Sequence, residues 1–518
     1  MIVPGRVSPI NQLKGGQCMS EKVEALDQGR RNFVKASLAG AAIAGSVLAG
    51  TGFSGVQSAH AGSKKTFITN AKLIAPDGII DGVSIAVENQ KIAFLTSEKI
   101  GPNAGEIIDA KGNYVMPGII DVHTHVGAFR PFEDDLKSES AAAAAGGVTT
   151  FYHYMLEGLG SPTGSMASRI DYYIDAVKRL STVDIGFHGT CMTETHLEDI
   201  KKCADRGLKN HKFFMAYKGD EMRRVGIVGI DLPYLYRGME CIRDIGGMAM
   251  VHAENYELMK LFGKRYSNNT FSDFNKSRPP ITEAVDADTA CRMSREVGVP
   301  LYIVHVGCGK VLDIANKFRN QGHPVYLETG PRYLNIDQEG KMCKKPWLAK
   351  TTPAYKTPED MARLWEGIKN NEFNTVATDS ACMNEKEHVG DGKIVKMLPS
   401  WQEMPTMLPM MLSEGYHKGR MSLNQIANYL CYNPAKLFGI YPQKGSLNPG
   451  SDADLIIVDI DKKQRVSGNM SPSYCDFSPY EGWELKGWPV MTMVRGKVVM
   501  KDGKVTGNPG WGRAVNLS

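Results

Sequence analysis

Two histidines separated by one residue form the first pattern with chemical meaning, His123 and His125 in the run Asp-Val-His-Thr-His. Residues i and i+2 of a β-strand project from the same side, so both imidazoles could bind one metal ion. The pair follows Pro117-Gly118 and ends an apolar run, which places it at a strand end. An isolated pair of this kind is weak evidence, so the metal hypothesis depends on further ligands elsewhere in the chain.

A lysine opens an apolar stretch that runs from Lys212 to Ala216. Burying a charged ammonium group among apolar side chains is costly. In one interpretation the side chain lies at a strand edge and reaches water. In the other it is held neutral, and a neutral amine can add carbon dioxide to become a carbamate. A carbamate has two oxygens and a negative charge, and it can therefore bridge two metal ions.

Three further polar residues, His252, His305 and Asp379, each end a short apolar run. A single histidine at such a place is more often a hydrogen-bonded core residue than a ligand. Two histidines in successive runs favour metal binding. A carboxylate at the end of the last run could bind metal and accept a proton.

The elements that must position these residues are an alternating series of strands and helices. Helical spacing over 165–180 and 283–297 separates short β-branched or aromatic runs, which predicts parallel strands. Eight such strands predict an α/β fold, a (β/α)₈ TIM-like barrel over residues 117–440. The chemistry-bearing residues then gather at the C-terminal ends of the strands, which are predicted at 119–126, 148–156, 184–192, 212–216, 248–252, 301–306, 324–329 and 374–378.

Both ends of the chain have a different character. Apolar and polar residues alternate between turn signals in residues 62–116, and similar strands recur in residues 441–518. We expect these two segments to pair into one small β-sandwich domain. A chain of 518 residues has room for a barrel and such a second domain.

Residues 1–61 carry the features of a twin-arginine signal peptide. Arg30-Arg31 precedes an Ala/Gly-rich apolar stretch, and Ala59-His60-Ala61 has the form of a cleavage site. The apolar stretch is too short for a membrane span. We therefore expect a periplasmic enzyme with no membrane association in its mature form.

The charge of the chain excludes one class of partner. The net charge is +5, and without the leader 55 basic and 53 acidic residues remain, a net charge of +2. A near-neutral protein gives no reason to expect a nucleic acid as partner. A small-molecule substrate is the expectation.

Taken together, the motifs resemble the amidohydrolase superfamily, and within it the hydantoinase/dihydropyrimidinase group. The similarity extends from about residue 67 to residue 512. It is most specific around Lys212 and Glu481, and further matching segments are residues 117–125, 145–150, 251–255 and 479–490.

The resemblance implies a binuclear metal site. His123 and His125 would hold the more buried ion, and His252 and His305 the second. Lys212, as a carbamate, would bridge both ions, and Asp379 would bind the first ion. Four histidines, a carboxylate and a carbamate suit two divalent ions, with zinc as the expected metal.

The resemblance also implies catalytic roles. A hydroxide that bridges the two ions would attack the amide, because divalent ions lower the pKa of bound water. Asp379 would act as the base, and Tyr217 would donate a hydrogen bond to the oxyanion. Residues 479–484 would belong to the β domain or to a contact between subunits of a tetramer or dimer.

Departures from the group concern the substrate. Ser380 stands where relatives commonly have histidine, and Gly330-Pro331 follows a threonine where they often have Cys-Pro. Ser400 lies near the position of a substrate-binding asparagine. We therefore predict substrate contacts at Tyr217, Gly330, Pro331 and Ser400, with an altered choice of substrate.

The favoured function is hydrolysis of a cyclic amide of the hydantoin or dihydropyrimidine type. Hydrolysis of a linear amide or a lactone on the same scaffold is the alternative. A non-enzymatic scaffold relative is less favoured, because all six predicted ligand residues are present.

Overall fold

The computed structural model describes residues 65–156, 164–219, 222, 226–267 and 269–517. The expected signal peptide over residues 1–61 lies outside the described residues.

Eight parallel strands form the barrel, and each strand is hydrogen-bonded to the next one along the chain. The ring is completed by a bridge between Thr124 and Ser380 and by the His125 amide, which donates to the Ser380 carbonyl at 2.8 Å. The expected (β/α)₈ barrel is confirmed. Its strands are β6 (Ile119–Thr124), β7 (Val148–Tyr154), β8 (Asp184–Thr190), β9 (Asn210–Phe214), β10 (Met248–His252), β11 (Leu301–Ile303), β12 (Val325–Thr329) and β13 (Thr375–Val376).

Amphipathic helices cover the outside of this barrel. In α3, the buried residues Ile170, Tyr173 and Val177 follow helical spacing and face the strands. Gly298, at φ 81°, takes the left-handed conformation that ends α8. The main outer helices are α2 (Phe132–Ala145), α3 (Ile170–Leu180), α4 (Glu194–Asp205), α5 (Leu232–Asp244), α8 (Pro280–Val297), α9 (Gly309–Arg319) and α11 (Pro358–Lys369).

Shorter helices lie in the loops and in the C-terminal part of the barrel. Among them, α10 begins directly after β12, where the sequence analysis placed the substrate contacts Gly330 and Pro331. The short helices are α6 (Tyr256–Gly263), α7 (Phe271–Lys276), α10 (Pro331–Asn335), α12 (Glu385–Val389), α13 (Met407–Met410), α14 (Leu423–Ala427) and α15 (Asn433–Leu437).

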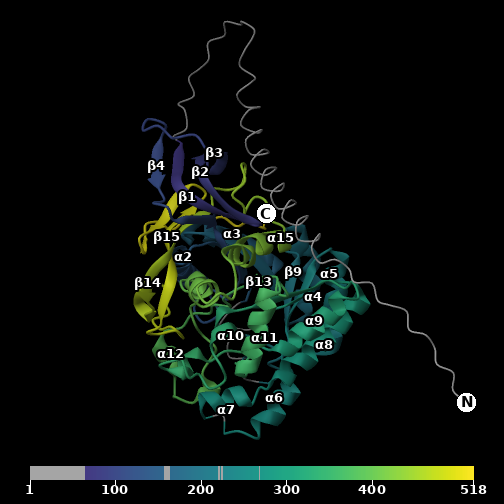
Figure 1. Ribbon diagram of the computed structural model, residues 1–518. Helices are drawn as coiled ribbons and strands as arrows, with labels where there is room; N and C mark the ends of the chain where they lie inside the picture. The colour runs from purple at the N-terminus through teal and green to yellow at the C-terminus, as the bar shows by residue number, and fades with distance from the viewer. Residues whose placement is uncertain (1–64, 157–163, 220–221, 223–225, 268, 518) are drawn as a thin grey trace, which may run out of the picture.

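The two ends of the chain share a second, largely antiparallel sheet of nine strands, as expected. In Figure 1 the purple N-terminal strands lie beside the yellow C-terminal strands, and the two sets meet where β5 pairs with β14. This sheet has a hydrophobic core separate from that of the barrel, formed by apolar residues such as Ile68, Ile85, Val115 and Leu455. The strands are β1 (Thr66–Ala75), β2 (Gly78–Glu88), β3 (Lys91–Thr96), β4 (Glu106–Asp109), β5 (Tyr114–Pro117), β14 (Leu455–Arg465), β15 (Glu484–Val494), β16 (Lys497–Lys501) and β17 (Lys504–Val505).

A buried cluster of charges joins this sheet to the bottom of the barrel. The Lys444 ammonium lies 2.6 Å from Asp184 Oδ2, at the start of β8, and 2.5 Å from Asp454 Oδ2, just before β14. Asp452 accepts from the same ammonium at 3.1 Å, and the Arg495 guanidinium donates to Asp184. The three carboxylates lie close enough together to hold a metal ion, but these two side chains already supply the positive charge.

Among the described residues the nine cysteines are unpaired, and all but Cys241 are buried. In the same part of the chain, no helix combines the length and the apolar character needed to cross a bilayer.

Replacing the buried lysine should destabilise the protein strongly. Lys444→Met leaves carboxylates buried without their main counter-charge, and we expect a loss of about 3–5 kcal/mol in the free energy of unfolding. Lys201→Met is the matched control, since that side chain is 80% exposed and should change the stability by less than about 0.5 kcal/mol. Urea denaturation measures both. Equal stability of the two variants would contradict the role given to the cluster.

Candidate metal centre

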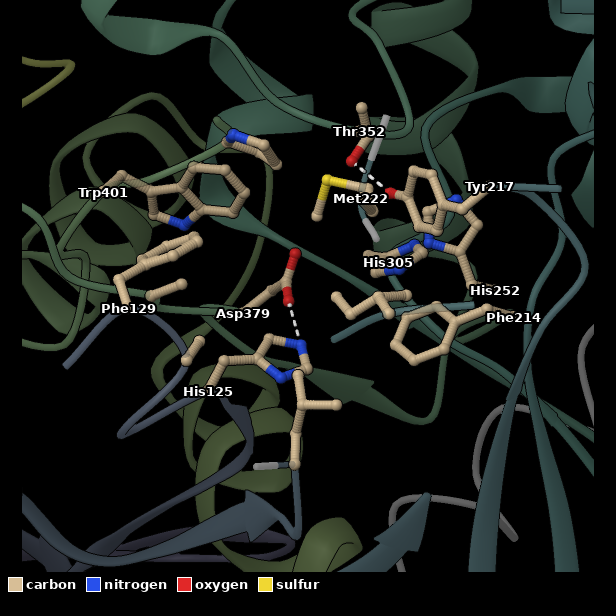
Figure 2. A pocket seen from close by; sticks show the side chains of 15 residues that line it. His125, Phe129, Phe214, Tyr217, Met222, His252, His305, Thr352, Asp379 and Trp401 are labelled. Atoms are coloured by element: carbon tan, nitrogen blue, oxygen red, sulfur yellow. Dashed lines mark hydrogen bonds and ion pairs between the residues drawn. The ribbon is translucent and has the colours of Figure 1, made fainter. Parts of the chain in front are cut away.

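A cavity opens at the C-terminal ends of the barrel strands, and its empty space, with the solvent at its mouth included, is about 500 Å³. Figure 2 shows the histidines and Asp379 on its floor, with aromatic side chains around them. Among the described residues, the polar lining consists of His125, His252, His305, Asp379, Tyr217, Thr352 and the Trp401 indole, and the other lining residues are apolar. The lining includes Phe129, Leu156, Phe214, Met222, Ile227, Ala381 and Pro399.

His123, His125 and Asp379 form a tight group of possible ligands. Asp379 Oδ1 lies 3.2 Å from His123 Nε2 and 3.0 Å from His125 Nε2, and the two Nε2 atoms are 3.2 Å apart. Strand β6 and the residue after it present the two rings, and Asp379 follows β13 with φ at +49°. These atoms are close enough together to surround a single cation.

Lys212 lies directly beside this group. Its side chain is fully buried, and Nζ lies 3.4 Å from His123 Nε2. The rings of Tyr154 and Phe214 lie within about 5 Å of the ammonium. Burial is the main cause that lowers the pKa of Lys212 to about 8, although Asp379 and Glu328 act to raise it. The side chain therefore does not reach water, and a substantial fraction is neutral near pH 8.

His252 and His305 complete the floor from β10 and from the turn after β11. Their ring centroids are 4.5 Å apart, and the centroid of His305 lies 5.4 Å from that of His123. Burial lowers the pKa of both rings, and that of His305 falls well below its usual value. The Nδ1 atom of His305 is buried without a hydrogen-bond partner among the described residues. Neutral imidazoles with unused nitrogens are the form that binds metal ions.

Two buried carboxylates, Glu328 and Asp121, form hydrogen bonds that fix the positions of the ligands. Glu328 Oε1 lies 2.7 Å from His123 Nδ1, which assigns the proton to Nδ1 and leaves Nε2 free for a metal. The same oxygen accepts from the His305 amide at 2.9 Å. Asp121 accepts from the amide and the hydroxyl of Thr378, which ties β6 to the strand end that carries Asp379. Desolvation by burial raises the pKa of both carboxyl groups to about 7.

Tyr217 lies at the upper edge of the cavity, as Figure 2 shows. Its hydroxyl lies 2.5 Å from Thr352 Oγ1, and its ring centroid lies 5.0 Å from that of His252. Burial raises the pKa of Tyr217 well above the usual value of 10. The hydroxyl thus keeps its proton at neutral pH and can donate a hydrogen bond.

Comparison with known proteins assigns the family. The profile described as "Amidohydrolase family" matches residues 114–499. The chain belongs to the amidohydrolase family. Within the family, a D-hydantoinase of Geobacillus stearothermophilus is 31% identical over 469 residues, 86% of this chain and 95% of that protein. An L-hydantoinase of Paenarthrobacter aurescens is 31% identical over 467 residues, 86% of this chain and 97% of that protein.

Solved structures agree with this family. The structure of L-hydantoinase (dihydropyrimidinase) from Arthrobacter aurescens has a TM-score of 0.80 and 30% identity, with 88% of this chain and all of that chain covered (100%). A crystal structure of D-hydantoinase has a TM-score of 0.80 and 28% identity, with coverage of 88% and 99%. The expected resemblance to the hydantoinase/dihydropyrimidinase group is confirmed.

The sequence analysis missed an arginine that holds the family's aspartate. Arg332 is fully buried in α10, and its Nη2 donates to Asp379 Oδ2 at 2.9 Å. Its Nη1 donates to Glu403 Oε2 at 3.1 Å, and the Tyr480 hydroxyl donates to the other oxygen of Glu403. Burial would raise the pKa of Asp379, but the neighbouring histidines and Arg332 outweigh it, and the pKa lies well below its usual value.

These contacts give residues 479–484 a role near the ligand cluster that the sequence analysis did not assign to them. They do not line the cavity, but Tyr480 is linked to Asp379 through Glu403 and Arg332. The sequence analysis had assigned the segment only to the β domain or to a subunit contact. Contacts between residues so far apart in the sequence leave no local pattern that would reveal them.

The predicted substrate contacts Gly330, Pro331 and Ser400 are buried but do not line the cavity. Gly330 and Pro331 begin α10 behind Asp379. Ser400 Oγ is buried without a partner among the described residues, while its neighbours Pro399 and Trp401 do line the cavity.

Gly330 makes room for the arginine. A Cβ atom at position 330 would lie 3.0 Å from Arg332 Nη1 and 3.2 Å from the Ala377 carbonyl. A larger residue at this position would press on the guanidinium. Gly330 therefore makes the position of Arg332 possible, and through it bears on Asp379.

Removing the arginine should weaken metal binding. In Arg332→Met, Asp379 loses a hydrogen bond and a positive neighbour, and we expect metal affinity to fall by about 10- to 100-fold. Metal content after dialysis against buffered zinc measures the effect. Arg292→Met, which removes an exposed arginine paired with Asp288 on α8, is the control and should retain metal. Equal metal retention by both variants would show that Arg332 does not position Asp379.

Proposed function

We propose that this protein hydrolyses a cyclic amide of the hydantoin or dihydropyrimidine type with two divalent metal ions, zinc in the first instance. The observation that carries the proposal is the convergence of six side chains of ligand type on one buried floor. Four of them, His125, His252, His305 and Asp379, line the cavity, and Lys212 lies within hydrogen-bond distance of His123 behind them. The hydantoinase relatives support the class of substrate.

The residues present fit two metal ions. His123, His125 and Asp379 would hold one ion, and His252 and His305 would hold the other. Lys212, carboxylated, would supply one oxygen to each. When bound, such ions make water acidic enough to attack at neutral pH and polarise the amide carbonyl.

The side chains of this protein move the protons. Asp379 is ionised at neutral pH and would accept the proton of the attacking water and then deliver it to the leaving nitrogen. Arg332 holds Oδ2, so Oδ1 is the oxygen turned toward the histidines. Tyr217 would turn its hydroxyl from Thr352 to the carbonyl oxygen as negative charge develops there.

Export by the twin-arginine route and assembly into a dimer or tetramer are further parts of the proposal. The leader over residues 1–61 supports export. Twin-arginine export carries folded proteins, so the ions could be bound before the enzyme reaches the periplasm. Light scattering of the purified enzyme measures the assembly, and a monomer would overturn that part.

Metal removal tests the central claim. Enzyme isolated from the periplasm should contain about two zinc ions per chain, open hydantoin and dihydrouracil rings, and lose activity on chelation until zinc is returned. Lys212→Ala should lose at least one ion and about 10²-fold or more in kcat/KM. Activity on linear amides or lactones without any ring opening of cyclic amides would favour the alternative hydrolase. Absence of metal together with an unaffected Lys212→Ala variant would overturn the proposal, and absence from the periplasm would overturn export.

The tyrosine can be tested separately from the metals. Tyr217→Phe removes the donor to the oxyanion, and we expect kcat to fall by about 10²- to 10³-fold with unchanged metal content. Thr352→Val is the control, because it removes the resting partner of the hydroxyl but keeps the donor. Steady-state kinetics on one hydantoin compares them. Equal losses in both variants would mean that Tyr217 acts through its contact with Thr352 alone.

A further inference from the structure

A buried glutamate on α8 holds the turn that carries His305, one of the two histidines assigned to the second metal ion. Glu283 is 2% exposed, and its Oε2 accepts a hydrogen bond at 2.9 Å from the amide of Gly307, two residues after His305. His305 takes a φ of 39°, which is unfavourable for residues other than glycine, so contacts with the surrounding structure must maintain the turn. Glu283 therefore helps to fix the direction of the His305 ring.

Glycine at position 307 allows this close approach. A Cβ atom there would lie 3.1 Å from Glu283 Oε1 and 3.2 Å from the ring of Tyr333. A larger residue would press on the carboxylate and displace the turn. The contact between Glu283 and the Gly307 amide thus depends on the side chain of one residue and on the small size of the other.

Lys356 supplies the counter-charge of Glu283. The lysine is 3% exposed, its ammonium lies 2.8 Å from Glu283 Oε1, and it donates to the Ala354 carbonyl at 2.7 Å. Burial would lower the pKa of Lys356, but Glu283 and Glu254 outweigh it and raise the pKa above its ordinary value. Lys356 is therefore charged at neutral pH and compensates the buried carboxylate.

Glu254, the other carboxylate that acts on Lys356, contacts the second histidine assigned to the same ion. Glu254 is fully buried, and its Oε2 lies 3.3 Å from His252 Nε2. This contact assigns the proton to Nε2 and leaves Nδ1 of His252 for a metal ion. The loop after His252 is also attached to α8, because the Asn255 amide donates to the Thr282 carbonyl at 2.8 Å. One cation thus attracts two carboxylates, and each carboxylate positions one of the two histidines.

The ligands of the first ion have supports of their own. Glu328 contacts His123, and Arg332 holds Asp379. Among the described residues, no hydrogen bond or ion pair joins Lys356 to either of these ligands. A change at Lys356 should therefore affect the two ions differently.

We infer that Glu283, Glu254 and Lys356 form a support for the second metal ion alone, with Lys356 as its central positioning residue. The inference rests on the proposed function, in which His252 and His305 hold that ion. Without Lys356, two buried carboxylates would lose a shared counter-charge, and the loops that they hold would shift. Loss of a group that orients metal ligands typically costs about 10- to 100-fold in metal affinity.

Zinc binding measures the effect directly. Zinc bound per chain is determined after dialysis of metal-free protein against a series of buffered zinc concentrations, and the wild-type chain should bind about two ions. Lys356→Met should bind one ion as the wild type does and the other about 10- to 100-fold more weakly. Glu283→Gln keeps the size of the side chain, should behave in the same way, and decides the matter if Lys356→Met does not fold. Lys276→Met, which removes a partly exposed lysine paired with Glu339, is the control and should bind both ions.

A second comparison separates positioning of the ligands from a general loss of stability. His305→Asn removes a ligand and should abolish binding of the same ion. Adding Lys356→Met to this variant should change the affinity for the remaining ion by less than about 2-fold, because the ion that Lys356 supports is already absent. A double variant that also loses the remaining ion would show that Lys356 stabilises the fold as a whole, and the inference would be wrong.

Wild-type binding of both ions by Lys356→Met and Glu283→Gln would overturn the inference and leave the proposed function standing. Equal weakening of both ions would do the same. A wild-type protein that holds two ions but opens no cyclic amide would overturn the proposed reaction alone, since the zinc measurement does not depend on turnover. A wild-type protein that binds no zinc would overturn both.

Discussion

The buried carboxylate of Asp379 is the constraint on which the site depends. An ionised carboxylate inside a protein is stable only where hydrogen bonds and positive charge replace water. Here His125, the residue after β6, supplies a hydrogen bond from Nε2, and Arg332 supplies positive charge from α10. The closure of the barrel between its first and last strands therefore brings together the groups that keep Asp379 ionised, and the fold and the ligand cluster stabilise each other.

Further ion pairs and hydrogen bonds surround Asp379 and its neighbours. Arg332 also holds Glu403, and Glu403 holds Tyr480 near the start of β15. On the other side Glu328 fixes the tautomer of His123 and the backbone of His305. The β domain is therefore connected to the ligand cluster. Its C-terminal half is linked to Asp379 by hydrogen bonds from Tyr480 through Glu403 and Arg332. It also contacts the bottom of the barrel through the ion pairs of Lys444.

Local patterns predicted much of this architecture, and contacts between distant residues explain what they missed. Apolar runs identified all eight barrel strands, and β10 was predicted at its observed bounds. β11 and β13 are shorter than predicted, and the chain turns after them, where His305 and Asp379 take positive φ values of 39° and 49°. Neither residue is glycine, so nothing in the sequence marks those turns. The sequence analysis singled out neither Asp121 nor Glu328, although both are acids within apolar strands, and nothing local in the sequence marks the partners of Arg332.

The lining of the cavity bears on the choice of substrate. The ring of a cyclic amide has no net charge, and under the proposed function it would lie between the ligand cluster and Tyr217, where the described lining residues include no lysine or arginine. D- and L-hydantoinases match this chain at the same 31% identity, so overall similarity does not define the substrate. The residues that line the cavity must therefore determine which substrate binds. Among the described residues, this lining includes Phe129, Leu156, Phe214, Met222 and Ile227, so a substituent on the ring would meet mainly apolar and aromatic surface.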